Sequence, residues 1–156
     1  MSDEQFMRMA IGKAREGMAA AQTPFGAAIA RAGELIACEH NMVWATTDIT
    51  AHAEVAAIRR ACAVLKSVSL AGCTIYSTCE PCPMCFAACH WAKCDRIVYG
   101  AAIDDARAAG FSELPISNEQ IKRLGNTPVQ ITGHFLREEA VELFRMFALQ
   151  GDARRY

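Results

Sequence analysis

The sequence has almost no net charge, since 16 lysine and arginine residues stand against 17 aspartate and glutamate residues and give a formal net charge of -1. The charges are scattered along the chain and form no basic stripe of the kind that polyanion binding usually requires. Nucleic acid is therefore not the expected partner. A small neutral substrate fits this composition better.

The sequence also lacks any uninterrupted apolar run that approaches the roughly 18 residues of a membrane span. Its first residues, Met1-Ser2-Asp3-Glu4, are acidic and have neither the basic region nor the apolar region of a secretory signal. We therefore expect a cytoplasmic protein without a membrane partner. Internal repeats, low-complexity tracts and linkers are absent, so we expect residues 1–156 to form a single domain.

Hydrophobic residues are abundant instead, at 53% of the chain, which indicates that another subunit covers part of the apolar surface. Cysteines are abundant as well. Five of the eight crowd into residues 79–94 of a chain of ordinary size. This crowding favours metal binding over the disulfide framework of a small secreted protein.

Hydrophobic periodicity and turn residues predict strands that alternate with helices, and hence an α/β protein. The expected architecture is a mixed five-stranded sheet between two helical layers, a three-layer αβα fold. We expect Thr50 to cap one helix and Ser117-Asn118-Glu119-Gln120 to open another as a capping box. The expected helices are 3–20, 51–65, 81–92, a short helix from 117 and 137–149, and the expected strands are 25–31, 34–44, 73–78, 96–99 and 129–133.

His52, Cys82 and Cys85 form a candidate set of zinc ligands. Zinc sites that catalyse hydrolysis use three protein ligands and leave the fourth position to water, whose pKa the metal lowers to about 7. The two cysteines stand at the expected start of a helix, where the helix dipole and a metal both favour thiolates. Pro81 and Pro83 suit that first turn. One Zn²⁺ per chain is therefore expected.

Glu54 is the candidate catalytic residue. It follows His52 by two positions, and on a regular helix such residues point roughly 200° apart, so both can face one site only at a helix terminus. A carboxylate beside an activated water can take its proton and pass it to a ring nitrogen and then to the leaving amine. The pairing of H-x-E with P-C-x-x-C is typical of zinc deaminases that act on nucleobases. The chain carries it as His52-Ala53-Glu54 and Pro81-Cys82-Pro83-Met84-Cys85.

Two other metal sites fit part of this pattern. The run of Cys79, Cys82, Cys85 and Cys89 has the spacing of a bacterial ferredoxin, but it lacks the second run and the following proline, and it leaves His52 and Glu54 unexplained. A closed structural zinc site would have no position for water. Under the open-site interpretation, Cys79 and Cys89 are buried packing residues.

On these motifs the chain resembles the cytidine-deaminase superfamily, and within it the branch of bacterial guanine deaminases and tRNA adenosine deaminases. The resemblance implies a cytidine-deaminase-like fold, a homodimer, and hydrolytic deamination of a free aminopurine, most simply guanine to xanthine plus ammonia, by zinc-activated water with Glu54 as proton shuttle. The stretches that carry it are Pro24-Phe25-Gly26-Ala27, Asn41, Thr50-Ala51-His52-Ala53-Glu54, Cys79-Glu80-Pro81-Cys82-Pro83-Met84-Cys85, His90-Trp91-Ala92 and Ala108-Ala109-Gly110-Phe111 followed by an acid.

The same resemblance implies a set of substrate-binding residues. Asn41 and Glu113 would contact the base, aromatic residues would stack on it, and Tyr156 would close the pocket. The aromatic and neighbouring positions are Phe25, Ala53, Trp91 and Phe111. Apart from the resemblance, Asn41 also suits a turn, Phe25 and Trp91 also suit a core, and Tyr156 also suits a free chain end.

Two departures from the family pattern leave the substrate open. Glu113 stands where the pattern has aspartate, and Ile49 replaces the proline before Thr50. The alternatives are a tRNA adenosine deaminase, for which the chain offers only the short basic pair Arg154-Arg155, and a deaminase of another amino-substituted heterocycle such as a pterin, a triazine or cytosine.

Overall fold

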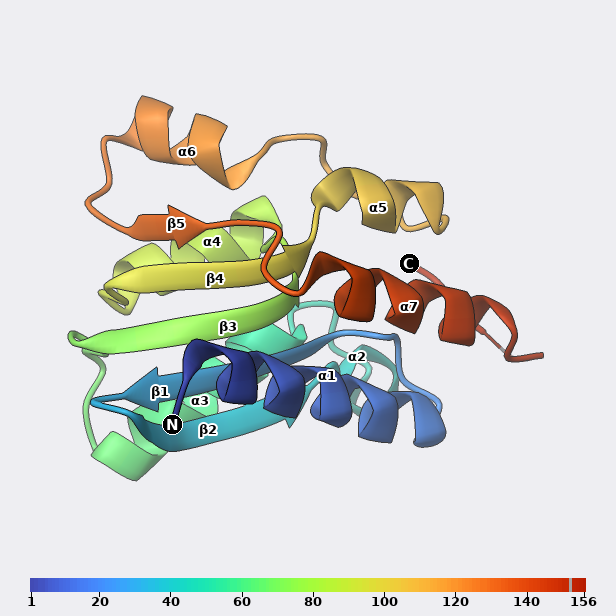
Figure 1. The fold of residues 1–156 in the computed structure, drawn as a ribbon, viewed down its shortest axis with the longest axis horizontal. Helices are drawn as coiled ribbons and strands as arrows, with labels where there is room; N and C mark the ends of the chain where they lie inside the picture. The colour runs from blue at the N-terminus through green and yellow to red at the C-terminus, as the bar shows by residue number, and fades with distance from the viewer. Residues whose placement is uncertain (152) are drawn as a thin grey trace.

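The computed structural model describes residues 1–151 and 153–156, and at its centre lies a mixed five-stranded sheet in the order β2-β1-β3-β4-β5 (Figure 1). β1 pairs antiparallel with β2 and with β3, whereas β4 and β5 extend the sheet in parallel to β3. The prediction of a mixed five-stranded α/β fold is confirmed. The strands are β1 (Gly26–Arg31), β2 (Glu34–His40), β3 (Cys73–Cys79), β4 (Arg96–Ala101) and β5 (Gln130–Thr132).

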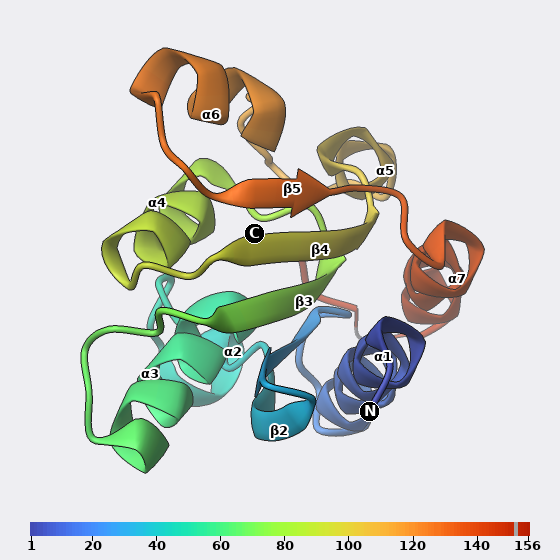
Figure 2. The same cartoon turned by 60° about the vertical axis from the view of Figure 1, so that its left-hand side comes forward.

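Helices cover both faces of the sheet. Figure 1 shows α1 (Asp3–Ala19) and α7 (Arg137–Ala148) in front of the sheet, and the turned view of Figure 2 places the sheet between this pair and α3 (Ala53–Leu65) with α4 (Pro83–Trp91). Alternate residues of β1 enter the two resulting cores. Ala28 and Ala30 pack toward α1 and α7, and Ala27 and Ile29 pack toward α3 and α4. Among the described residues, no helix is long and apolar enough to cross a membrane.

Two short helices, α2 (Val43–Thr46) and α5 (Ile103–Ala108), fall where the sequence analysis expected none. The strand expected to reach residue 44 ends at His40, because the Asn41 side-chain oxygen accepts a hydrogen bond from the Val43 backbone N–H at 3.0 Å and turns the chain. α5 was expected to be loop. Its first turn is closed by the Asp105 carboxylate, which accepts from the Ala102 backbone N–H at 2.8 Å.

Of the two predicted helix caps, the one at Ser117 is confirmed and the one at Thr50 is wrong. Ser117 does open α6 (Asn118–Gly125) with a capping box, since its hydroxyl accepts from the Gln120 N–H and the Gln120 side chain accepts from the Ser117 N–H. The prediction that Thr50 caps α3 is wrong. The cap position of α3 belongs to His52, and the Thr50 hydroxyl instead donates to the Asp48 carboxylate at 2.6 Å.

One edge of the sheet gathers the segments that carry the candidate site. In the antiparallel pairs the start of β1 lies beside the ends of β2 and β3, and Cys79 at the end of β3 lies beside Ala101 at the end of β4. Phe25 directly precedes β1, Asn41 directly follows β2, and Cys82 comes shortly after the end of β3. In open α/β sheets ligands bind at the carboxyl ends of the parallel strands, so this edge is where a site is expected.

Candidate active site

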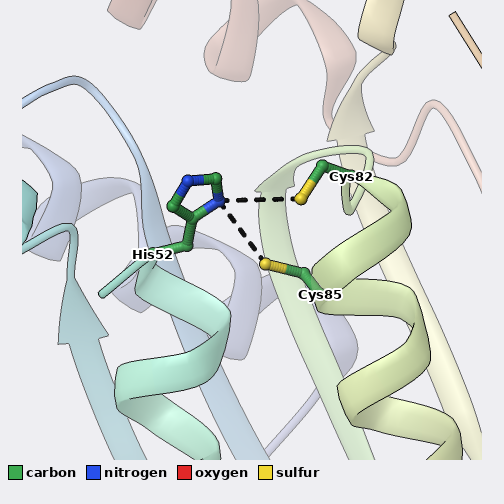
Figure 3. A group of neighbouring side chains, drawn as sticks. All are labelled: His52, Cys82 and Cys85. Atoms are coloured by element: carbon green, nitrogen blue, oxygen red, sulfur yellow. Dashed lines mark hydrogen bonds between the residues drawn. The ribbon is translucent and has the colours of Figure 1, made fainter. Parts of the chain in front are cut away.

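The three candidate metal ligands come from the first turns of two helices on the same face of the sheet. His52 is the cap residue of α3, and Cys82 is the cap residue of α4, each with extended backbone angles. Pro83 occupies the first position of α4, where its missing N–H costs no hydrogen bond. Cys85 follows in the same first turn, so both sulfur atoms face His52 (Figure 3).

The spacing of these ligands fits a tetrahedral zinc ion. His52 Nδ1 lies 3.7 Å from Cys82 Sγ and 3.5 Å from Cys85 Sγ (Figure 3). With Zn–N near 2.0 Å and Zn–S near 2.3 Å, tetrahedral geometry requires a nitrogen–sulfur separation of about 3.5 Å. Among the described residues these three form the one group of His, Cys, Asp or Glu side chains whose ligand atoms all lie within 4.8 Å of one another. Since no further side chain of the described residues joins this group, a zinc ion held by it would keep its fourth ligand position for water.

The pKa values of the two cysteine thiols are shifted in opposite directions. A hydrogen bond from the Cys85 thiol, helped by another from His52, lowers the pKa of Cys82 to about 4 against the opposing effect of burial. Cys82 is therefore a thiolate at neutral pH, which is the form that binds zinc. The same hydrogen bond to Cys82, together with burial, raises the pKa of Cys85.

Glu54 lies in the first turn of α3, directly beside this group. One carboxylate oxygen lies 3.6 Å from Cys85 Sγ, and the other accepts a hydrogen bond from the Ser77 hydroxyl at 3.1 Å. The residue is buried, with 6% of its surface exposed, and burial raises the pKa of its carboxyl group. A carboxyl group whose pKa is raised toward neutrality is suited to exchange protons with a substrate.

Two cavities that share lining residues lie beside His52 and Cys82, and we call the larger the outer cavity and the smaller the inner cavity. The outer cavity has a volume of about 290 Å³ and is lined by His52, Cys82, Glu113 and Tyr156 together with apolar side chains at its mouth. Ile49, at the position where the family pattern has proline, belongs to that mouth. A smaller inner cavity shares these four residues. It also reaches Glu54 and Phe25, so the Glu54 carboxylate and the candidate ligands His52 and Cys82 line one space.

Phe25, Glu113 and Tyr156 line this space, whereas Asn41 lines neither cavity and contacts Tyr156 instead. Asn41 is buried, its side-chain NH₂ donates to the Tyr156 hydroxyl at 2.6 Å, and the Tyr156 ring lies 5.5 Å from the His52 ring. Glu113 lines both cavities. Burial, followed by the negative charges of Cys82 and Glu54, raises the pKa of Glu113 to about 7.

Other predicted substrate residues lie behind the cavities or away from them. Phe111 is buried and packs edge-on against Phe25, with the two ring centroids 4.9 Å apart. It therefore supports Phe25, which lines the inner cavity, and does not line the cavity itself. Ala53 is fully buried between His52 and Glu54. The structure does not bring Trp91 to the cavities, because it is the last residue of α4, at the opposite end of that helix from Cys82, and it is 80% exposed.

The sequence did not point to Ser77 or Thr23 as site residues, and it marked Glu80 only as part of a stretch that carries the family resemblance. Ser77 orients Glu54, and the fully buried Thr23 lies 3.4 Å from the Tyr156 hydroxyl. Glu80 lines the inner cavity. The sequence offered one signal for Ser77, because a polar residue within a buried strand needs a hydrogen-bond partner and so indicates a polar site nearby.

The ferredoxin-like run does not assemble as a cluster site. The Cys79 thiol lies 3.7 Å from the Ala102 carbonyl and packs in the core beneath α1 and α7. Cys89 packs in the other core, beneath α3 and α4. Only two of the four cysteines therefore face the metal position, together with His52.

Comparisons with known proteins agree with this geometry. The family described as the cytidine and deoxycytidylate deaminase zinc-binding region matches residues 1–101. A guanine deaminase of Bacillus subtilis is 45% identical over 120 residues, which cover 76% of this chain and 77% of that protein. A tRNA-specific adenosine deaminase of Aquifex aeolicus is 38% identical over 101 residues, which cover 65% of this chain and 67% of that protein. The solved structure of a guanine deaminase from Nitrosomonas europaea has a TM-score of 0.86 at 32% identity, covering 93% of this chain and 84% of that one.

Proposed function

We propose, from the premise that this chain belongs to the cytidine and deoxycytidylate deaminase family, that it is a zinc-dependent guanine deaminase that hydrolyses guanine to xanthine and ammonia. The observation that carries the proposal is the open set of His52, Cys82 and Cys85 with the buried Glu54 carboxylate beside it, in a cavity that also holds Glu113. The similarity to guanine deaminases supports guanine as the substrate.

The ligand set fits one zinc ion per chain. When bound, zinc supplies the positive charge that activates a water molecule at neutral pH. Glu54 takes one proton from the attacking water and delivers it to a ring nitrogen as the C–O bond forms. It then takes the second proton from that oxygen and delivers it to the amino group, which leaves as ammonia when the C–N bond breaks. Ser77 holds one oxygen of that carboxylate, so the other remains directed toward the metal position.

The recognition of guanine rests on Glu113. Guanine presents N–H donors on the edge that carries its amino group, and a carboxylate that accepts from them forms charge-assisted hydrogen bonds worth about 1.5–3 kcal/mol each. Adenine and cytosine present a different pattern of donors and acceptors. Phe25 lines the inner cavity, whose volume of about 10 Å³ holds no base until Tyr156 moves, and the same movement frees the Asn41 side-chain amide for the base.

A homodimer stays a prediction. Ile49 and Leu114 at the mouth of the outer cavity are 59% and 60% exposed, and a second copy would cover them.

Deamination of a tRNA adenosine is the second candidate, favoured by the 38% identity to the Aquifex aeolicus enzyme. Ammonia release from a panel of guanine, adenine, cytosine, their nucleosides, an aminotriazine and a tRNA anticodon stem-loop separates the candidates. We expect guanine to give the highest kcat/KM. Salt-sensitive binding and turnover of the stem-loop, with none of guanine, would contradict the proposal and support the tRNA enzyme.

We expect Glu113→Ala to lower kcat/KM for guanine by at least about tenfold, because one or more charge-assisted hydrogen bonds to the base are lost. Glu113→Asp, which restores the carboxylate of the family pattern, serves as the matched control and should retain most of the activity. Steady-state kinetics on the zinc-loaded proteins measure both. Unchanged kinetics of Glu113→Ala would remove Glu113 from the site.

A further inference from the structure

The buried carboxylate of Glu80 joins the starts of two helices. Glu80 is 7% exposed and follows β3 directly. One of its oxygens accepts from the backbone N–H of Ile103, the first residue of α5, at 3.1 Å. The other accepts from the backbone N–H of Asn118, the first residue of α6, at 2.8 Å. Both oxygens are therefore engaged by backbone donors, which leaves Glu80 to act through those segments rather than on a substrate.

Two further hydrogen bonds strengthen the same junction. The backbone N–H of Glu80 donates to the carbonyl of Ala101 at 2.7 Å, and the fully buried Asn118 side chain donates to the carbonyl of Pro81 at 2.6 Å. Residues 80 and 81 are thereby fixed to the segments before α5 and at the start of α6. Cys82, the metal ligand, is the next residue along the chain.

The loop that carries Glu113 runs between these two helices. α5 ends at Ala108 and α6 begins at Asn118, so Glu113 stands near the middle of the connection. Its downstream end, Asn118, is bonded to the Glu80 carboxylate directly, and its upstream end leaves α5, a helix whose first residue is bonded to the same carboxylate. The metal ligand segment and the base-binding loop are thus linked through one side chain.

We propose that Glu80 is a positioning residue that sets the distance between the metal position at Cys82 and the base-binding carboxylate of Glu113. This inference rests on the proposed function, in which Glu113 holds the base while zinc-activated water attacks it. Near-attack geometry tolerates little displacement, so a shift of the loop lowers productive binding without removing any reacting group.

A double-mutant cycle on zinc-loaded protein tests the proposal. Glu80→Gln keeps the shape of the side chain but places an NH₂ group opposite one of the two backbone N–H donors. We expect kcat/KM for guanine to fall about tenfold, mainly through a higher KM, with zinc still bound at one equivalent per chain. In a Glu113→Ala background the same substitution should change kcat/KM less than about twofold, because the residue through which it acts is gone.

Asp105→Asn is the matched control, since Asp105 also caps α5 but is bonded to Ala102 and Arg137 and not to α6 or residues 80–82. We expect it to lower the melting temperature and leave KM unchanged. If Glu80→Gln does not fold, Glu80→Asp takes its place, because the shorter side chain keeps the charge but cannot reach both donors.

Three results would overturn the proposal: equal losses from Glu80→Gln with and without Glu113, loss of zinc from Glu80→Gln, or an equal rise in KM for Asp105→Asn. Failure of the proposed function shows separately, as a wild-type protein that deaminates another base of the panel. The cycle is then measured with that base, and coupling between the two positions still supports positioning by Glu80. A wild-type protein that deaminates no base overturns both.

Discussion

Glu54→Gln is expected to lower the rate of ammonia release by about 10²–10⁴-fold, the usual contribution of a general acid–base group, while one zinc ion per chain stays bound. The amide keeps the shape of the side chain and can still accept from the Ser77 hydroxyl, but it cannot take a proton from water. Zinc remains because Glu54 is not among the three ligands. Steady-state ammonia assays and metal analysis of the same preparation measure the two effects together.

The control for this variant is Glu119→Gln, which removes a carboxylate from the first turn of α6, at an exposed position. It should behave like the unmodified protein in both assays. Activity of Glu54→Gln within a few-fold of the unmodified protein would contradict the role of Glu54. Loss of zinc from Glu54→Gln would instead place the carboxylate in the metal site.

Cys82→Ser is expected to abolish turnover by removing zinc. Loss of a residue that only orients a metal ligand typically costs about 10–100-fold in metal affinity, so loss of a ligand itself should lower zinc affinity by more than about 100-fold. The hydroxyl of serine, unlike the Cys82 thiol, is not ionised at neutral pH and is a poor zinc ligand. Competition with a chromophoric chelator measures the affinity, and the ammonia assay measures the activity.

Cys89→Ser is the matched control, because Cys89 belongs to the same run of cysteines but packs in the core beneath α3 and α4. Replacing the buried thiol, which is hydrogen-bonded to Cys94, by the more polar hydroxyl should lower the free energy of unfolding by about 1–3 kcal/mol and leave zinc affinity unchanged. A comparable loss of metal from Cys89→Ser would contradict the three-ligand site. It would also revive the ferredoxin-like interpretation, in which Cys89 is a ligand.

The grouping of the three candidate zinc ligands was predictable because their arrangement depends on local structure. Cys82 and Cys85 lie at the start of one helix, and His52 and Glu54 lie at the start of another. Short spacings in the sequence and the residues that begin a helix were therefore enough to predict where these side chains lie. The fold was predictable for a similar reason. Strands and helices alternate along the chain, and few sheet topologies accept that order.

The contacts that complete the site depend on pairs distant in sequence, and no local pattern reports them. Ser77 meets Glu54 across 23 positions, and Tyr156 meets Asn41 across 115. The position of Trp91 was misjudged for the same reason, since an aromatic residue in a family motif does not reveal which end of its helix faces the cavity. The cap of α3 was wrong because Asp48 takes the Thr50 hydroxyl in a local turn.

Titration of metal-free protein with zinc, followed by the initial rate of ammonia release from guanine, tests the central claim most directly. We predict a rate that rises in proportion to added zinc, reaches its maximum at one equivalent per chain and remains there. Absence of ammonia at every zinc concentration, or a rate that does not depend on zinc, would contradict a zinc-dependent guanine deaminase.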